Sequence, residues 1–369
     1  MILTNYWWLI IWALLVGGYM STMVQKQKEY ICGKTEYRWG WLPAVSLILP
    51  YIIWAGTRGS GFGDTAAYKQ IFNEAPNHLN QLSEYLVTVN KDKGFSVLVV
   101  LLKTILGNST VVFFTIIATI QMLLIVKTCR KYSVNYWISI FLFVASTDYI
   151  AWMHNGIRQF MAITIIFAAT PLIIEKKYVQ LIGVILLAST FHASALIMIP
   201  IIFIVQGKAW NKRTLLCILT CILIIFFVDK FTDILDSLLA STQYSGMVTD
   251  WAEWEDNGTN PIRVLVFSVP MLLSIVGLKY IKFEDNVVVN IMTNFSILAC
   301  GVALVSMVTS GIFIGRMVEY FSIFAMLLLL PWEIENMFNQ KSARIVTILM
   351  IVGYIIFFYF QMHFIWGLV

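Results

Sequence analysis

Two arginines stand at the start of apolar runs, where a charged side chain is unusual. Arg158 lies in "NGIRQF", with Asn155 and Gln159 beside it as candidate supporting residues, and Arg316 lies in "GRMVEYF". A guanidinium keeps its charge at any physiological pH and binds phosphate oxygens with two parallel N–H groups. The first turn of a helix adds free N–H groups and the positive end of the helix dipole. The two arginines therefore indicate a pocket for a phosphate-bearing lipid.

Each arginine also has a structural interpretation. Glu319 follows Arg316 by three residues, which is helical pairing distance, so it is either a supporting residue of the site or a simple ion-pair partner. Arg158 has no acid within one helical turn, although Asp148 is near enough in sequence to reach it across the turn. A functional role is therefore better supported for Arg158.

A glycine-rich stretch, "TRGSGFGDTAAYKQIF", is a second candidate element. Glycines at positions 59, 61 and 63 permit tight turns that expose backbone N–H groups to an anion. Asp64, Tyr68 and Phe72 follow at four-residue spacing, which predicts one helical face with an acid, a phenol and a ring. The alternative is that Asp64 is only the N-cap of that helix and that Phe72 is simply buried.

Two histidines lie on the same predicted side as the arginines. His192, in "ASTFHASALIMIP", falls at a turn between two short apolar segments, and His154 lies one helical turn before Arg158. Imidazole is the side chain best suited to moving a proton near neutral pH. A lone histidine in apolar surroundings is also commonly a satisfied core residue, so the functional and the structural interpretations of His192 are balanced.

The stretch "TDWAEWEDNG" combines aromatic and acidic residues. Trp251 and Trp254 have faces that stack on sugars, and the acids at 250, 253, 255 and 256 suit hydroxyl groups or a metal. They also suit a solvated acidic lid. Because no D-x-D pattern is present, no metal site is predicted.

Composition identifies the solvent of the chain. Hydrophobic residues make up 59% of the 369 residues and charged residues only 12%, with a mean hydropathy of +0.80. A soluble domain carries roughly a quarter charged residues. The chain lacks the polar surface of that class, so its solvent must be largely lipid.

Apolar runs predict an all-α polytopic membrane protein with about 12 spans of ~20 residues each, forming one domain over residues 1–369. Gly94–Leu106 is apolar but too short to cross and contains Lys103, so it is predicted to be interfacial or re-entrant. The predicted spans are Tyr6–Val24, Trp41–Gly56, Val111–Val126, Asn135–Trp152, Gly156–Ile174, Tyr178–Phe191, Ala193–Val205, Thr214–Val228, Arg263–Tyr280, Val287–Val308, Ile312–Leu330 and Ile345–Met362.

Basic residues predict the sidedness. With both termini outside and Gly94–Leu106 not crossing, most of the 25 basic residues fall in inner loops, as the positive-inside rule requires. If that segment crossed, "KTCRKY", "EKK" and "GKAWNKR" would all fall outside. Two long external loops follow from this topology: residues 57–93, continued by the re-entrant segment to 106, and residues 229–261.

The order of these motifs resembles the EpsG family, a branch of the Wzy-type bacterial polysaccharide polymerases. "RGSGFGDTAAYKQIF", "KGFSVLVVLLKTIL", "NGIRQFMAI" and "FHASALIMIP" carry the resemblance between Arg58 and Pro200, and "GRMVEYF" extends it. Lys93 departs from the acid-proline-glycine run common in the family, which leaves a catalytic acid at Glu84 or Asp92 open.

The resemblance implies a glycosyltransferase in the bacterial inner membrane with its active site facing outside. It would join polyprenyl-pyrophosphate-linked oligosaccharide repeat units, without a cofactor or metal, and its candidate partners are a chain-length regulator and a flippase, not nucleic acid. Arg158 and Arg316, with Arg58 as a candidate third, would hold the departing pyrophosphate. His192, or Asp64 as the second choice, would accept the hydroxyl proton, with Tyr68 in support.

Other function classes remain as alternatives. A glycan ligase would use similar arginines, and a membrane O-acyltransferase would also use a buried histidine. A flippase for lipid-linked oligosaccharides must expose its site to both sides, which predicts polar residues along the spans to the inner face. Most charges here stop near one face, so the polymerase is favoured.

Overall fold

The chain is almost entirely helical. The computed structural model describes residues 4–240 and 258–367, and these form two compact units. The first unit comprises residues 1–197 and 345–369, and the second comprises residues 198–344. Most of the second predicted external loop, including Trp251 and Trp254, lies outside the described residues. The single-domain interpretation stays a prediction.

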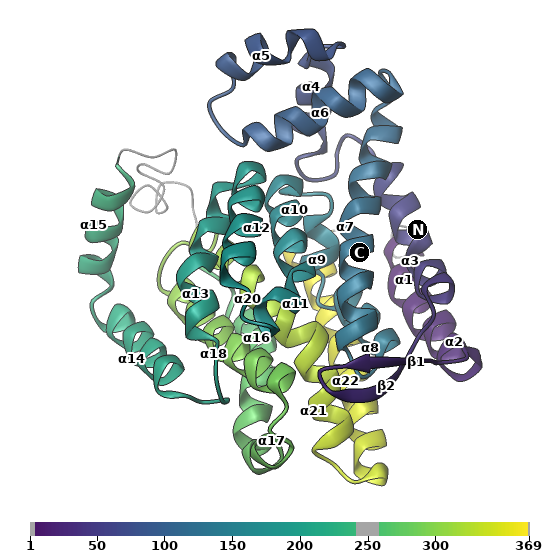
Figure 1. Cartoon of the computed structure of the whole chain (residues 1–369), viewed down its shortest axis with the longest axis vertical. Coiled ribbons are helices and arrows are strands. Elements are labelled where there is room, and N and C mark those ends of the chain that lie inside the picture. The colour runs from purple at the N-terminus through teal and green to yellow at the C-terminus, as the bar shows by residue number, and fades with distance from the viewer. Residues whose placement is uncertain (1–3, 241–257, 368–369) are drawn as a thin grey trace. The chain divides into compact units, whose positions relative to one another are not determined.

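The first unit contains most of the predicted site motifs and, among its described residues, one pair of strands (Figure 1). Its α-helices are α1 (Thr4–Ile11), α2 (Gly17–Met23), α3 (Trp41–Gly56), α4 (Thr65–Glu74), α5 (Leu82–Thr88), α6 (Lys93–Leu106), α7 (Thr110–Tyr132), α8 (Tyr136–Ala145), α9 (Asp148–Trp152), α10 (Ile157–Ala168), α11 (Thr170–Ile174), α12 (Tyr178–Phe191) and, from Ile345 on, α22 (Gln340–Phe360). Short 3-10 or π segments are η1 (Trp12–Val16), η2 (Leu79–Gln81), η3 (Ala193–Ile197) and η6 (Gln361–Ile365).

Helix lengths confirm an all-α membrane protein. Within the described residues, five helices are long and apolar enough to cross a membrane, or up to seven if each of two bent helix pairs counts as one span. Shorter apolar helices of 10–17 residues lie within five other predicted spans, of which Asn135–Trp152 and Gly156–Ile174 are each broken into two helices. The total of about 12 crossings stays a prediction. The five long helices are Tyr6–Met23, Thr110–Tyr132, Val287–Met307, Ile314–Asn336 and Gln340–Ile365.

The first predicted external loop is folded into helices. α4, α5 and α6 lie together at one end of the first unit, against the start of α7 (Figure 1). Their buried rings share one apolar cluster, in which Phe72 stacks on Phe113 with ring centroids 4.6 Å apart. Lys103 is buried here, and its ammonium group donates hydrogen bonds to the carbonyls of Asn73, at 2.8 Å, and Ala75. It thereby satisfies carbonyls at the end of α4 that have no helical partner.

The opposite end of the first unit carries a β-hairpin that the sequence analysis did not predict. β1 (Gln27–Ile31) and β2 (Lys34–Arg38) pair antiparallel, joined by Cys32 and Gly33, which both have positive φ as a tight hairpin turn requires. Arg130 of α7 pairs with Glu29 and holds the hairpin on the helix end.

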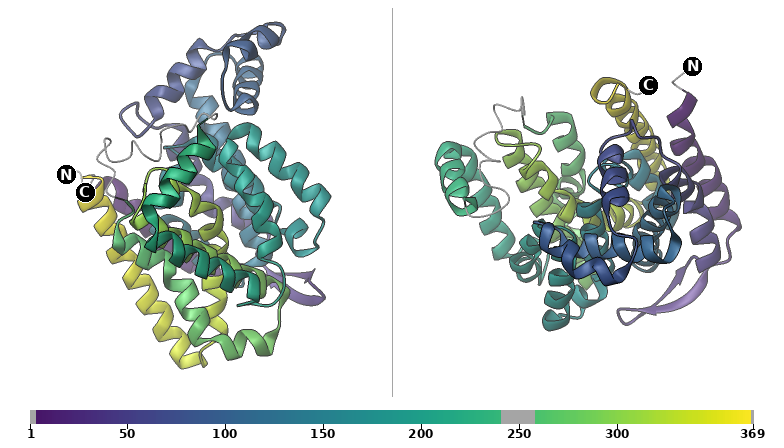
Figure 2. Two further views of the ribbon diagram at one scale, coloured as in Figure 1. Left: turned by 90° about the vertical axis from the view of Figure 1, so that its left-hand side faces the viewer. Right: turned by 90° about the horizontal axis from the view of Figure 1, so that it is seen from above.

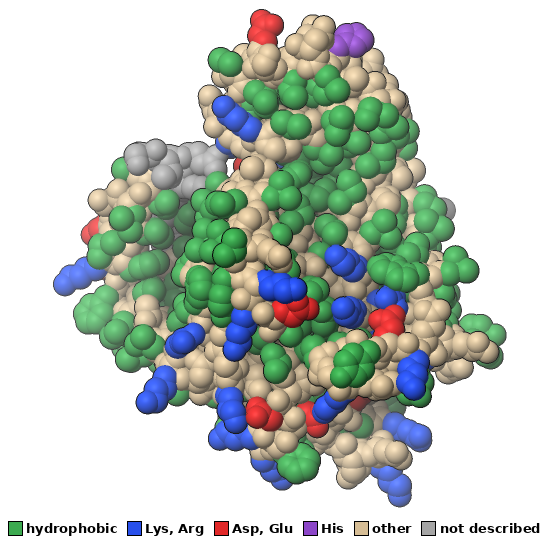
Figure 3. All heavy atoms as spheres, in the orientation of Figure 1, with side chains coloured by type: hydrophobic (Ala, Val, Ile, Leu, Met, Phe, Trp, Pro, Cys, Tyr) green, Lys and Arg blue, Asp and Glu red, His purple; other side chains and the backbone are tan. Residues whose placement is uncertain are grey.

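Basic side chains gather at this hairpin end. On the face drawn in Figure 3, apolar side chains cover α7 between the α4–α6 end and the hairpin, and Lys and Arg side chains gather beside the hairpin. Figure 2 shows the two strands as an arm beside the helices of the first unit. The predicted topology places this basic end on the inner side, because lysine and arginine concentrate on the cytoplasmic ends of membrane helices, and that sidedness stays a prediction.

The second unit is built around α18, whose side chains are buried along most of its length. α14, α16 and α20 pack against it. Polar residues inside α18 have specific partners: the amide oxygens of Asn290 and Asn294 accept from the backbone N–H groups of Ala209 and Trp210 at 3.0 and 3.2 Å. The helices of this unit are α13 (Met198–Ile204), α14 (Lys212–Phe226), α15 (Val228–Leu239), α16 (Pro261–Val276), α17 (Leu278–Glu284), α18 (Val287–Met307), α19 (Ile314–Met317), α20 (Glu319–Phe324), η5 (Ala325–Leu329) and α21 (Leu330–Asn336).

Candidate active site

An ion pair between α6 and α10 lies at the centre of the candidate site. Arg158 is in the first turn of α10, and its Nη1 is 2.7 Å from Oδ2 of Asp92. Gly156 begins this helix with φ +74°, and a Cβ there would lie 2.2 Å from the ring of Trp152. Only glycine therefore permits the turn that carries Arg158 to this position. The guanidinium also lies 5.9 Å from the ring centre of Tyr68.

Asp92 is the acid that pairs with Arg158, and it is the N-cap residue of α6 with φ +55°. Its side chain is only 4% exposed, and its Oδ1 is buried without a hydrogen-bond partner among the described residues. Burial raises the pKa of the Asp92 carboxyl, while the charges of Arg158 and Lys91 and the backbone N–H of Ala193 act in the opposite direction. One oxygen is thus fixed by an arginine and the other remains available.

The turn that carries His192 lies beside Asp92. His192 ends α12, and its Nδ1 is 2.6 Å from the hydroxyl of Ser194. The next residue, Ala193, faces the Asp92 carboxylate with its N–H group. Gly94 brings α6 close to α12, because a Cβ on it would lie 2.0 Å from the hydroxyl oxygen of Thr190. The predicted histidine motif therefore borders the ion pair, with His192 itself half-buried.

The glycine-rich loop approaches the same place from α4. With its side-chain amide oriented to donate, Asn155 reaches the two carboxylate oxygens of Asp64 at 3.1 and 2.8 Å. A Cβ on Gly63 would lie 3.1 Å from the Asn155 Cβ. Asp64 occupies the predicted N-cap position but makes no capping hydrogen bond with its side chain. Its contact with Asn155 joins the loop to "NGIRQF" instead.

Arg58 and His154 lie together, both buried. Arg58 donates through Nη1 to the carbonyl of Met153 at 2.7 Å and lies 4.0 Å above the ring of Phe114. His154 is bound through Nδ1 to the carbonyl of Ile150 at 3.1 Å. Burial and the nearby charge of Arg58 lower the pKa of His154 to about 3, so the imidazole is neutral.

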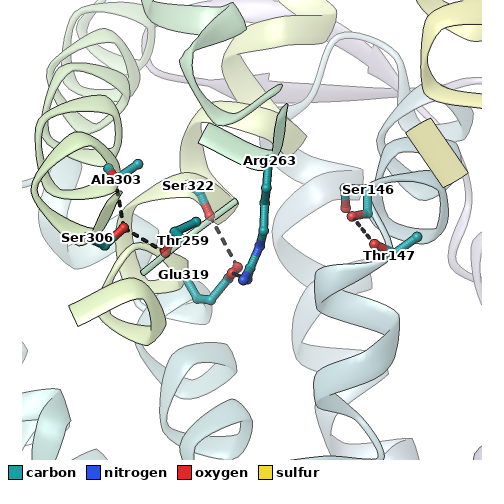
Figure 4. Close-up of polar contacts among 8 residues, drawn as sticks. All are labelled: Ser146, Thr147, Thr259, Arg263, Ala303, Ser306, Glu319 and Ser322. Atoms are coloured by element: carbon teal, nitrogen blue, oxygen red, sulfur yellow. Dashed lines mark hydrogen bonds and ion pairs between the residues drawn. The ribbon is translucent and has the colours of Figure 1, made fainter. Parts of the chain in front are cut away.

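The second unit contains the remaining predicted residues. Glu319, at the start of α20, is fully buried and pairs with Nη2 of Arg263 at 3.1 Å, while Ser322 donates to its other oxygen (Figure 4). Arg316 lies in α19 and is half-buried. The expected pocket shared by Arg158 and Arg316 joins residues of different units and stays a prediction. Gln159 is buried in α10 of the first unit.

The family model described as EpsG family matches residues 41–366. The chain belongs to the EpsG family. Neither the curated proteins nor the solved structures include a match to it. EpsG-type proteins are Wzy-like polysaccharide polymerases, and the matched range of this EpsG-family chain includes every residue of the candidate site.

Sequence reasoning left one functional candidate of the EpsG-family protein open and missed a second. Asp92 was left open because Lys93 interrupts the family pattern, and it is nevertheless the acid that binds Arg158. Arg263 had no local signal, since its partner Glu319 is far along the chain. One sequence feature could have identified both residues: a charged side chain at the start of a predicted apolar helix. Asp92 and Arg263 share this feature with Arg158.

Proposed function

We propose that this protein polymerises polyprenyl-pyrophosphate-linked oligosaccharide repeat units on the external face of the bacterial inner membrane. The observation that carries the proposal is the convergence of four separate segments around the Asp92–Arg158 pair. The glycine-rich loop, the start of α6, the start of α10 and the turn after α12 all meet there. They bring acids, an arginine and a histidine to the end of the first unit that lies away from the basic hairpin.

The chemistry requires charge stabilisation and one proton acceptor. A sugar hydroxyl of one repeat unit attacks the anomeric carbon of another, a new carbon–oxygen bond forms, and the bond to pyrophosphate breaks with its electron pair leaving on the phosphate oxygen. Arg158 and Arg58, both in the first unit, are the proposed ligands of the departing pyrophosphate, since positive groups aimed at developing charge stabilise the transition state.

Asp92 is the proton acceptor that the geometry favours. Asp64 is exposed and both its oxygens face the Asn155 amide, whereas the Oδ1 atom of Asp92 is buried and has no partner among the described residues. Burial also makes the Asp92 carboxylate more basic. His192 remains the second choice, because its turn contacts the same carboxylate.

A genetic test separates this proposal from its rivals. Loss of a polymerase leaves single repeat units attached to the final acceptor, loss of a ligase leaves none, and loss of a flippase strands lipid-linked units on the inner leaflet. We expect single attached units in a deletion strain, and long chains again when the wild-type gene is restored. Either of the other two patterns would refute the proposed function.

A further inference from the structure

The Arg58–His154 pair differs electrostatically from the Asp92–Arg158 pair. Arg158 is neutralised by a carboxylate, but within the described part of the chain Arg58 forms no ion pair, and its Nε and Nη2 atoms are buried without a hydrogen-bond partner. The residue as a whole is only 7% exposed. Such an arrangement is unfavourable on its own, because a buried charge requires partners for its N–H groups.

The two unpartnered nitrogen atoms lie along one edge of the Arg58 guanidinium, which can bind an anion. Nε and Nη2 of one guanidinium are the two parallel donors that bind a phosphate in bidentate fashion. Nη1 is fixed on Met153 and the plane lies against Phe114, so this edge is held in one orientation. Arg58 is therefore a preorganised receptor for an oxyanion.

His154 adds an acceptor beside this donor edge. Its Nδ1 faces the carbonyl of Ile150, which only accepts, so Nδ1 carries the proton and Nε2 has the free lone pair. Nε2 is also buried without a partner among the described residues. The rings of Trp54 and Phe62 flank the imidazole at 4.2 and 4.7 Å between centroids. A suitable ligand thus offers oxyanion oxygens to Arg58 and a hydroxyl to His154.

We propose that Arg58 and His154 form the subsite for the glycosyl phosphate group of the donor, in which Arg58 binds the phosphate and His154 accepts from a hydroxyl of the attached sugar. This rests on the proposed function, and it makes Arg58 the principal phosphate receptor. Arg158 then acts chiefly as the positioning partner of Asp92. The glycine-rich loop contributes to the subsite through Phe62, whose ring packs against the imidazole of His154.

Thermal unfolding of the purified full chain in detergent tests the subsite. We expect inorganic pyrophosphate and a panel of sugar 1-phosphates to raise the Tm of the wild type, since a ligand of the folded state stabilises it. Arg58→Met should unfold several degrees higher than the wild type without ligand, because a buried charge with two unpartnered nitrogen atoms is gone. The same variant should bind phosphate at least about 30-fold more weakly, as losing one side of a charged contact does.

Three further variants make the result specific. Arg58→Lys keeps the charge without the bidentate edge and should bind at least about 10-fold more weakly while folding normally. His154→Phe should lose only the preference for a sugar 1-phosphate over pyrophosphate. Lys69→Met is the matched control, because Lys69 is a cation of the same segment whose ammonium contacts Ser60, and it should keep the wild-type shift.

The possible outcomes separate this inference from the proposed function. If Arg58→Met is less stable than the wild type and keeps the ligand-induced shift, Arg58 is structural and the subsite is refuted, while the polymerase proposal stands. Unchanged sugar preference in His154→Phe refutes the role of His154. If no phosphate probe shifts the wild type, the phosphate site of the proposed function is refuted with it.

Discussion

The two members of the central ion pair are predicted to respond unequally when either is neutralised. Arg158→Met removes the guanidinium and leaves the Asp92 carboxylate, which is 4% exposed, without its partner. Asp92→Asn instead leaves Arg158, whose side chain is 24% exposed and accessible to water. We therefore expect Arg158→Met to destabilise the protein more than Asp92→Asn does.

The magnitude follows from burial. Removing one partner of a fully buried ion pair costs about 3–5 kcal/mol. Because water screens the exposed part of Arg158, we expect about 2–3 kcal/mol for Arg158→Met and below about 1 kcal/mol for Asp92→Asn. At about 2–4 °C per kcal/mol for a domain of 150–250 residues, the Tm of Arg158→Met should fall by roughly 4–12 °C.

The difference in Tm between Arg158→Met and the wild type should also depend on pH. Burial already raises the folded-state pKa of Asp92, and the loss of Arg158 removes its main opposing charge. A carboxyl whose pKa is higher in the folded state stabilises the protein below its unfolded value, and that contribution is lost as the pH rises through the folded value. The Tm of Arg158→Met should thus approach that of the wild type as the pH is lowered. Equal losses in both variants, or a difference that does not change with pH, would contradict the burial argument.

Three other perturbations test the packing and the sidedness. Gly94→Val should displace α6 from α12 and abolish polymer formation, measured as chain length in cells. Gly183→Ala should not, because a Cβ on Gly183 meets open space. Intact polymer in Gly94→Val would refute the close approach of α6 to α12. Asn155→Asp places a second carboxylate beside Asp64 and should lower the polymerisation rate at least about 10-fold at pH 7, with recovery at acid pH. A rate that does not depend on pH would contradict the contact between Asn155 and Asp64. Cys32, exposed in the hairpin turn, should react with an impermeant maleimide in inverted vesicles and not in intact cells; the reverse pattern refutes the predicted sidedness.

The sequence was sufficient to predict features that depend on a single segment of the chain. The apolar runs predicted most of the membrane helices. In "NGIRQF", the glycine directly before an apolar run predicted that Arg158 lies in the first turn of a helix. The hairpin was missed because the same charged residues that mark an inner loop also alternate along strands. The ion pairs Asp92–Arg158 and Arg263–Glu319 were missed because each joins helices distant in the sequence. Tertiary packing decides such pairs, and no local periodicity encodes it.

The same limit explains which arginine was favoured. Sequence reasoning favoured a functional role for Arg158, because Arg158 has no acid within one turn of its own helix, and named Arg58 only as a candidate third ligand. In the folded chain Arg158 has an acid from another helix, and it is Arg58 that lacks one within the described residues. A residue that seems unpaired along the chain is therefore a weaker indicator than one that is unpaired in space.

Polymerisation by the purified protein tests the central claim most directly. Lipid-linked repeat units are incubated in liposomes containing a chelator, with wild type, Asp92→Asn or Glu84→Gln, and the products are separated on a gel. Glu84 is an exposed acid of α5 and serves as the matched control. We predict a ladder with the wild type and with Glu84→Gln, and a rate at least about 100-fold lower with Asp92→Asn, as expected for a lost proton acceptor. A normal ladder from Asp92→Asn, or none from the wild type, would contradict the account.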